Sequence, residues 1–175
     1  EEGFEVVGSP AVIEPKLDGF RVQIHRKKDE VKLFTRRLDE VTNQFPDVVK
    51  AVKDYVRSTE IILDTEVVGI DPETKRTLPF QEISQRIRRK YDIASIVKKL
   101  PVCITVFDVL ELNGENMLDM PLEERKKKLK GVLKVKDNVI EMIDQLITDD
   151  VKKGEKFYLE CLDQGHEGVM MKKKE

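Results

Sequence analysis

The sequence is poor in the residues that build metal scaffolds and disulfide frameworks. Its two cysteines, Cys103 and Cys161, lack the CxxC spacing of a zinc site, and its two histidines, His25 and His166, have no metal-ligand pattern around them. These shortages argue against a structural zinc site and against a fold held together by disulfides. We therefore expect packing cysteines and ordinary surface histidines.

Long apolar runs and a signal peptide are also lacking. The most apolar stretch, residues 100–112, is interrupted by Asp108 and Glu111, so it does not fit a membrane span. We expect an intracellular protein without a membrane partner. The chain starts at Glu1 and stops within a strand-like run of lysines, and we expect it to be cut from a longer protein.

The sequence also lacks an excess of charge of one sign. The 32 basic and 34 acidic residues nearly cancel, although charged residues make up 38% of the chain, against about 25% in an average soluble protein. Any nucleic-acid surface must therefore be a local patch. With 175 residues and 39% hydrophobic content, the chain is long enough for one domain with a proper core.

The sequence does contain clear strand and helix patterns. Period-two alternation predicts a strand over residues 20–25. Strongly apolar runs predict strands over 61–70 and 102–112, and short strands are predicted over 31–36 and 169–171. Helical spacing predicts helices from 46, over 79–90, from 121 and over about 148–163, the last with Val151, Tyr158 and Leu162 on one face. Separated groups of strands with helices between them indicate an α+β domain of mostly antiparallel sheets flanked by helices.

Charged side chains occupy two unusual places in this pattern. Lys16 falls at the end of one strand, and the Asp18-Gly19 turn leads into the next. Asp64 and Glu66 lie two residues apart on an otherwise apolar strand, so they share one face. Carboxylates at such a place need a functional reason.

Residues 14–21 (EPKLDGFR) contain the pattern K-x-D-G-x-R. Average residue frequencies give such a match in a chain of this length with a chance on the order of one in a thousand. The plainer interpretation is a hairpin with an exposed lysine. The segment resembles, however, motif I of the covalent nucleotidyltransferases, the superfamily of ATP-dependent DNA ligases, RNA ligases and mRNA capping enzymes.

Further matches follow in the order of that family. Residues 34–36 (FTR) resemble the next ligase element, 63–68 (LDTEVV) motif III, 107–109 (FDV) motif IIIa and 167–172 (EGVMMK) motif IV. Each match alone is weak, but five in order over nearly the whole chain are specific. Residues 78–81 (LPFQ) resemble the replicative-type DNA ligases of archaea and eukaryotes rather than capping enzymes.

The resemblance implies the adenylation (nucleotidyltransferase) domain of an ATP-dependent DNA ligase over residues 1–175, with an ATP-grasp-like fold. Lys16 would attack the α-phosphorus of ATP and carry AMP as a phosphoramidate. The lysine pKa, about 10.4 when unperturbed, would have to fall, and Arg21, Lys172 or a divalent cation could supply the positive charge. Glu66 and Glu167 would hold Mg²⁺ or Mn²⁺, with the ribose as an alternative partner of Glu66.

The same resemblance implies the other site residues. Glu14 would bind the adenine amino group, and the ring of Phe107 would stack on the purine. Arg21 would contact phosphate, Arg36 would contact phosphate on nicked DNA, and Lys172 would contact the α-phosphate. In the family reaction, AMP then passes to a 5′-phosphate at a nick, and the 3′-hydroxyl displaces it to seal the strand.

Two basic runs lie outside these motifs. Arg86, Arg88, Arg89 and Lys90, at the end of one predicted helix, could lie along a DNA backbone or form a solvated helix end, and we weigh the two equally. Residues 125–128 are expected to be a solvated helix face.

The chain departs from the family in its later motifs. Motif V, a K-x-K strand, has no convincing counterpart, and these 175 residues lack the OB-fold domain with motif VI and the N-terminal DNA-binding domain. We therefore expect the chain to retain AMP weakly and to seal nicks poorly or not at all. Family analogy gives nicked double-stranded DNA and a sliding clamp, contacted through the missing regions, as partners of a monomeric enzyme in the nucleoid or nucleus.

Other interpretations share these residues. An RNA ligase or a capping guanylyltransferase would keep Lys16 and the glutamates but use another polynucleotide or GTP. An NAD-dependent ligase is disfavoured because the sequence after motif III follows the ATP-dependent group. A non-catalytic module that binds nucleotide or DNA stays open, because the truncation argues for inertness while intact Lys16, Glu66 and Glu167 argue against it.

Overall fold

The computed structural model describes residues 2–174, and its strands form two sheets. The smaller sheet is antiparallel and has the order β10 (Gly168–Lys173), β1 (Ala11–Lys16) and β9 (Leu146–Thr148). The larger sheet has the order β3 (Glu30–Thr35), β2 (Phe20–Lys27), β4 (Glu60–Ile70), β6 (Val102–Leu112) and β7 (Glu115–Asn116). In addition, β5 (Thr77–Leu78) pairs with β4, and β8 (Ile140–Met142) runs parallel to β6.

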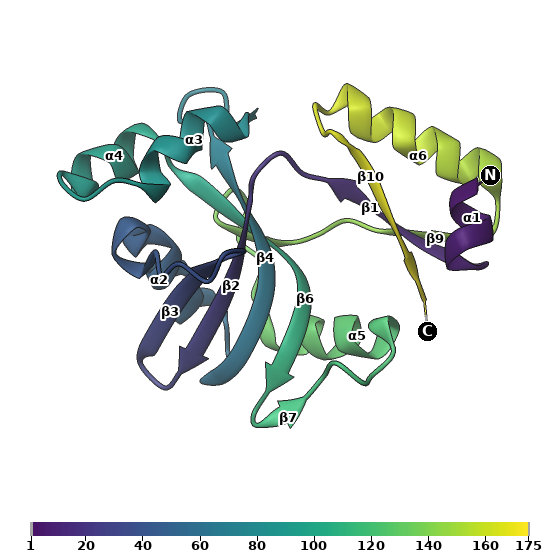
Figure 1. Cartoon of the computed structure of the whole chain (residues 1–175), viewed down its shortest axis with the longest axis horizontal. Helices are drawn as coiled ribbons and strands as arrows, with labels where there is room; N and C mark the ends of the chain where they lie inside the picture. Colours follow the sequence, from purple (N-terminus) through teal and green to yellow (C-terminus); the bar gives the residue numbers. More distant parts are fainter. Residues whose placement is uncertain (1, 175) are drawn as a thin grey trace.

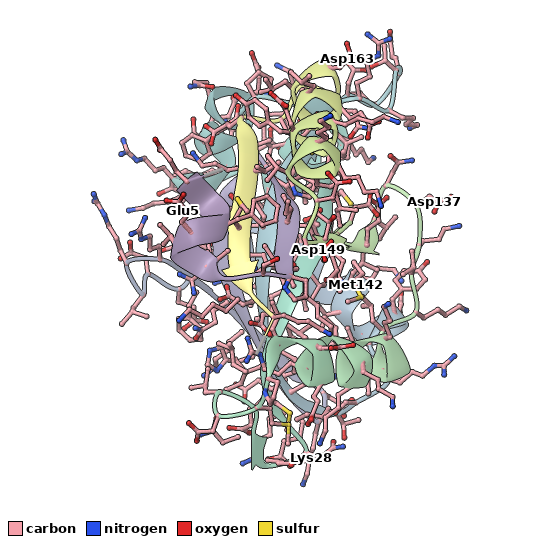
Figure 2. All side chains as sticks on the ribbon, turned by 90° about the vertical axis from the view of Figure 1, so that its right-hand side faces the viewer. Glu5, Lys28, Asp137, Met142, Asp149 and Asp163 are labelled. Carbon is pink, nitrogen blue, oxygen red and sulfur yellow. The ribbon has the colours of Figure 1, made fainter. Side chains whose placement is uncertain are left out.

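Helices pack on both sheets (Figure 1). The larger sheet carries α2 (Pro46–Tyr55), α3 (Phe80–Ile87) and α5 (Leu122–Val132), with the 3-10 helix η1 (Thr42–Gln44) beside β3 and α4 (Ile93–Lys99) after α3. The smaller sheet carries α1 (Glu2–Val7) and α6 (Val151–Asp163). Figure 2 looks onto this smaller sheet, with β10 in front, α6 above and α5 below. No helix among residues 2–174 is long and apolar enough to span a membrane.

The predicted α+β class, with mostly antiparallel sheets flanked by helices, is confirmed. The five predicted strands correspond to β2, β3, β4, β6 and β10. The helix predicted over 79–90 ends earlier, at Ile87, and the separate helix α4 was not predicted. Asp92, between the two helices, has a φ of 53°, a left-handed conformation that interrupts a continuous helix.

The core explains why β2 alternates. Its Phe20, Val22 and Ile24 side chains are buried among apolar residues of β4, β6, α2 and α5. Successive side chains of a strand point to opposite faces, so Arg21 and Gln23 lie on the face away from this core. The hydrophobic pattern of the sequence thus determines which face of the larger sheet can carry polar chemistry.

The link from β1 to β2, residues 17–19, joins the two sheets. A Cβ atom at Gly19 would lie 2.4 Å from the backbone oxygen of Val67 and 3.1 Å from Cγ of Glu66. Only glycine lets the link approach β4 this closely. Lys16, at the end of β1, is thereby held next to the polar face of the larger sheet.

Both interpretations of the basic run are wrong for Arg86. Its side chain is 0% exposed, and its guanidinium donates to both carboxylate oxygens of Asp47, at 3.0 and 2.6 Å. It also lies 4.4 Å above the ring of Phe45. Arg86 therefore ties α3 to the start of α2 and is neither a DNA contact nor a solvated helix end.

Helix α6 packs through small residues rather than through the expected face. Tyr158 and Leu162 are 40% and 39% exposed, whereas Gly154 and Cys161 are buried. A Cβ atom at Gly154 would lie 3.1 Å from Cδ1 of Ile13, so glycine lets the helix lie close on β1. Cys161 and Cys103 are free and buried, which confirms that both are packing cysteines.

Candidate functional site

One cleft of about 1390 Å³ is lined from both sheets. Its walls include every residue that the sequence assigned to the site: Glu14, Lys16, Arg21, Arg36, Glu66, Phe107, Glu167 and Lys172. These residues lie up to 158 positions apart in the chain. The fold therefore brings the separate motifs into one place.

Lys16 lies at the end of β1, opposite Gly168 of β10. Its Nζ is 2.8 Å from Oε2 of Glu167, and the two side chains are 53% and 46% exposed. The backbone N–H of Glu167 also donates to the Lys16 carbonyl at 2.9 Å. The hydrogen bond to Glu167 and its negative charge raise the pKa of Lys16, so the amine stays protonated in this state.

Two acidic residues of the candidate site region, Asp64 and Glu66, lie on β4. Nε and Nη2 of Arg21 donate to Oδ1 and Oδ2 of Asp64, at 2.8 and 2.5 Å, and Glu66 lies opposite Arg21 in the strand register. Burial, and next the charge of Asp64, raise the pKa of Glu66 to about 7. These contacts confirm that Asp64 and Glu66 share one face. Within residues 2–174, Asp64 is neutralised by Arg21, whereas Glu66 has no ion pair.

The acids of the cleft fit a divalent cation that also binds phosphate. No group of three His, Cys, Asp or Glu side chains that could hold a metal ion exists among the described residues. Glu66 and Glu167 nevertheless lie close enough for the charge of Glu167 to raise the pKa of Glu66 further. Mg²⁺ commonly takes one or two carboxylates and completes its shell with phosphate and water. Two neighbouring carboxylates suit that kind of site.

The other end of the cleft is built around Glu14, which is 1% exposed. Its Oε1 accepts from Nζ of Lys126 and its Oε2 from Nζ of Lys172, both at 2.5 Å. The Lys172 ammonium also lies 5.1 Å from the centre of the Phe107 ring. Burial lowers the pKa of Lys126, and the charge of Glu14 opposes this effect.

Lys126 is a buried partner of the site residue Glu14 that sequence reasoning missed. The expectation that residues 125–128 form a solvated face is wrong for Lys126, which is 3% exposed, and for Arg125, which pairs with Asp108 at 2.8 Å. A signal was present in the spacing of Leu122, Lys126 and Leu129, which places Lys126 on the inward stripe of α5. The surrounding run of lysines concealed it.

Arginines line the rim of the cleft. Arg36, Arg37 and Arg88 are exposed, and none of the three forms an ion pair within the described part of the chain. Arg89, from the same basic run as Arg88, lies 3.7 Å from Asp92 instead. Arg37 was not singled out by the sequence. The three free guanidiniums give the rim a positive charge suited to phosphate groups.

Known proteins are similar to this chain in sequence. A family model described as ATP dependent DNA ligase domain matches residues 1–175. DNA ligases from Nanoarchaeum equitans and Methanopyrus kandleri are 49% and 43% identical to this chain over 172 residues. These matches cover 98% of this chain but only 30% and 31% of the relatives, so the chain spans less than a third of their length.

Solved structures share the fold. A mycobacterial DNA ligase D complexed with ATP and MES has a TM-score of 0.70 at 23% identity, covering 97% of this chain and 50% of that protein. A Chlorella virus DNA ligase-adenylate has a TM-score of 0.64 at 17% identity, covering 97% of this chain and 56% of that one. Such low identities show the fold alone. The family match over the entire sequence establishes that this chain belongs to the family of ATP-dependent DNA ligase domains.

Proposed function

We propose that this chain transfers the adenylyl group of ATP to Lys16, as the first step of joining a nick in DNA. One observation carries the proposal: the half-exposed Lys16 amine lies in a single cleft with the acids, the aromatic ring and the arginines that such a transfer needs. The Nζ atom would attack the α-phosphorus, pyrophosphate would leave, and a phosphoramidate bond to AMP would form.

Attack requires that the Lys16 ammonium lose its proton. Because Glu167 raises the pKa of Lys16 in the free protein, its carboxylate must turn away from the amine before attack. The pair is exposed, and water and salt weaken exposed pairs, so exchange of partners is easy. Glu167 is thus an exchangeable partner of the protonated amine before substrate arrives.

Glu66 and Glu167 are proposed as the protein ligands of Mg²⁺ or Mn²⁺. The cation would supply charge neutralisation on the phosphate oxygens. Two roles remain open for Glu66 within the proposal, the metal and the ribose. Arg21 is proposed as a phosphate contact, and its bidentate pair with Asp64 fixes the guanidinium plane beforehand.

Nicked double-stranded DNA is proposed as the second substrate. The relatives are named DNA ligases, and this chain spans less than a third of them, so further parts of a longer protein are expected to take part in sealing. In this chain, the exposed Arg36, Arg37 and Arg88 support a phosphate-binding rim. After transfer, AMP would pass from Lys16 to the 5′-phosphate, and the 3′-hydroxyl would displace it.

Incubation with α-labelled ATP or GTP and Mg²⁺, followed by intact mass measurement, tests the first step. We expect AMP on the wild-type chain, no label on Lys16→Ala, and no GMP on either protein. Lys53→Ala, which removes an exposed lysine of α2 outside the cleft, is the matched control and should label like wild type. Equal label on Lys16→Ala, or no label on wild type, would contradict the proposal.

A further inference from the structure

The buried pair of Glu14 and Lys126 needs an explanation beyond stability. Their side chains are 2% and 3% exposed, and Nζ lies 2.5 Å from Oε1. Replacing such a buried ion pair by well-packed apolar residues is often neutral or stabilising. Two apolar side chains could therefore fill this part of the protein interior without loss of stability. We infer that the charges serve the cleft that Glu14 lines.

The two oxygens of Glu14 have partners on different sides. Lys126 reaches Oε1 from the inward stripe of α5, whereas Lys172 reaches Oε2 from β10, with its side chain 27% exposed. Lys172 and Glu14 both line the cleft, and Lys126 does not. Oε1 is therefore fixed from within the protein, and Oε2 is the oxygen offered to a ligand.

The Lys172 ammonium occupies the place that a donor on a stacked ring would take. It donates to Oε2 of Glu14 at 2.5 Å and lies 5.1 Å from the centre of the Phe107 ring. A flat base stacked on Phe107 would present its edge to the same oxygen. Lys172 would then be released, because one oxygen cannot accept from both donors in the same direction.

We propose that Lys126 is a positioning residue that fixes Glu14 as the acceptor for the exocyclic amino group of a 6-aminopurine, and that Lys172 holds that position until nucleotide enters. The inference rests on the nucleotide binding proposed above. An ionised carboxylate can only accept hydrogen bonds, and the 6-oxo group of a purine can only accept as well. A Glu14 oxygen fixed opposite the purine 6-position therefore favours a 6-amino group over a 6-oxo group.

Titration calorimetry with ATP and with inosine triphosphate tests the role of Lys126, because these ligands differ only in the 6-amino group of ATP and in the 6-oxo group and N1 proton of inosine triphosphate. A hydrogen bond to a charged group corresponds to a preference of roughly 10- to 100-fold, which we expect for ATP in the wild-type chain. Lys126→Met should reduce the ratio of the two affinities to near one, and Lys126→Arg should restore most of it. A purely structural role would weaken both ligands equally and leave the ratio unchanged.

Lys127→Met is the matched control, because Lys127 is the next residue of α5 and is exposed. It should leave the ratio unchanged. If Lys126→Met does not fold, as circular dichroism would show, the double variant Glu14→Leu with Lys126→Met removes both charges and leaves neither unpaired. It should bind the two nucleotides about equally, and retained preference for ATP would overturn the proposal.

Adenosine and AMP test the role of Lys172. Lys172→Met removes the competing ammonium, so adenosine should bind a few-fold more tightly, whereas AMP should bind more weakly if Lys172 moves to its phosphate. Weaker binding of adenosine to Lys172→Met would overturn the proposal that Lys172 occupies the base position at Glu14 until nucleotide enters. Binding is measured without transfer, so loss of label on Lys16 with an intact preference for ATP would contradict the proposed function alone. Failure of the wild-type chain to bind either triphosphate would overturn both.

Discussion

At one end of the cleft, the side chains of Glu14 and Lys126 are 2% and 3% exposed, and at the other end those of Lys16 and Glu167 are 53% and 46% exposed. Both are ion pairs of a lysine with a glutamate. The buried pair is held by a low dielectric and by packing, whereas water and salt weaken the exposed pair. The same chemical pair thus serves as a fixed support in one place and as an exchangeable contact in the other.

The difference matches the tasks of the two ends. Recognition of a base needs an acceptor that keeps its direction, and preorganisation reduces the cost of ordering it on binding. Transfer to Lys16 needs an amine that changes its proton and its partner during the reaction. The prediction is that variants at the base end change stability and selectivity, while variants at the phosphate end change reactivity.

The largest expected effect is on the stability of the base end. Lys126→Met leaves the buried Glu14 with Lys172 as its remaining partner, and loss of one member of a buried pair costs about 3 kcal/mol. Lys16→Met, an exposed substitution, should change the free energy of unfolding far less. Urea unfolding of the three proteins measures both. Equal losses of unfolding free energy for Lys126→Met and Lys16→Met would contradict the proposed difference between the buried and the exposed ion pair.

The next effect is expected from Glu66, which lines the same cleft. Its folded-state pKa of about 7 exceeds the value of 4.5 for an unperturbed glutamate, so the folded protein binds the proton more tightly than the unfolded chain does. The contribution of Glu66 to stability is therefore complete below about pH 4.5 and declines as pH rises through 7. Glu66→Gln should be more stable than wild type at pH 8, by about 3 kcal/mol, and nearly equal at pH 4.5.

Urea unfolding from pH 4.5 to 8 measures that difference. Subtracting the wild-type curve from the Glu66→Gln curve cancels other titrating groups, such as His25 and His166, whose pKa values are lowered by burial. Glu155→Gln, on the exposed side of α6, should follow wild type at every pH. A constant difference between Glu66→Gln and wild type would mean that Glu66 does not titrate in this range.

The sequence predicted the parts of this site that depend on local pattern. Alternation along β2 and the two-residue spacing of Asp64 and Glu66 on β4 determined which side chains share a face, and the Asp18-Gly19 turn placed Lys16 at a strand end. The motifs supplied the remaining cleft residues through family resemblance. These features involve neighbours in the chain or residues that the family pattern already identifies.

Burial of charge was not predictable in the same way. Lys126 meets Glu14 across 112 positions, and Arg86 meets Asp47 across 39. A lysine or arginine in a basic run is usually solvated, and only the fold supplies the partner that compensates its burial. Helix α4 was not predicted because the break before it was not recognised. Asp92 adopts a left-handed conformation there, and the sequence has no strong turn signal at that position.

The smallest expected effect concerns Arg88, the one basic residue of 86–90 that lines the cleft. If its exposed guanidinium contacts a DNA phosphate, Arg88→Ala should reduce affinity for nicked DNA and make the plot of log affinity against log salt shallower by about 0.9. Fluorescence anisotropy at several salt concentrations measures both. Arg76→Ala, at an exposed position outside the cleft, is the control. An equal loss for both variants, or an unchanged slope for Arg88→Ala, would leave Arg88 as a solvated helix end.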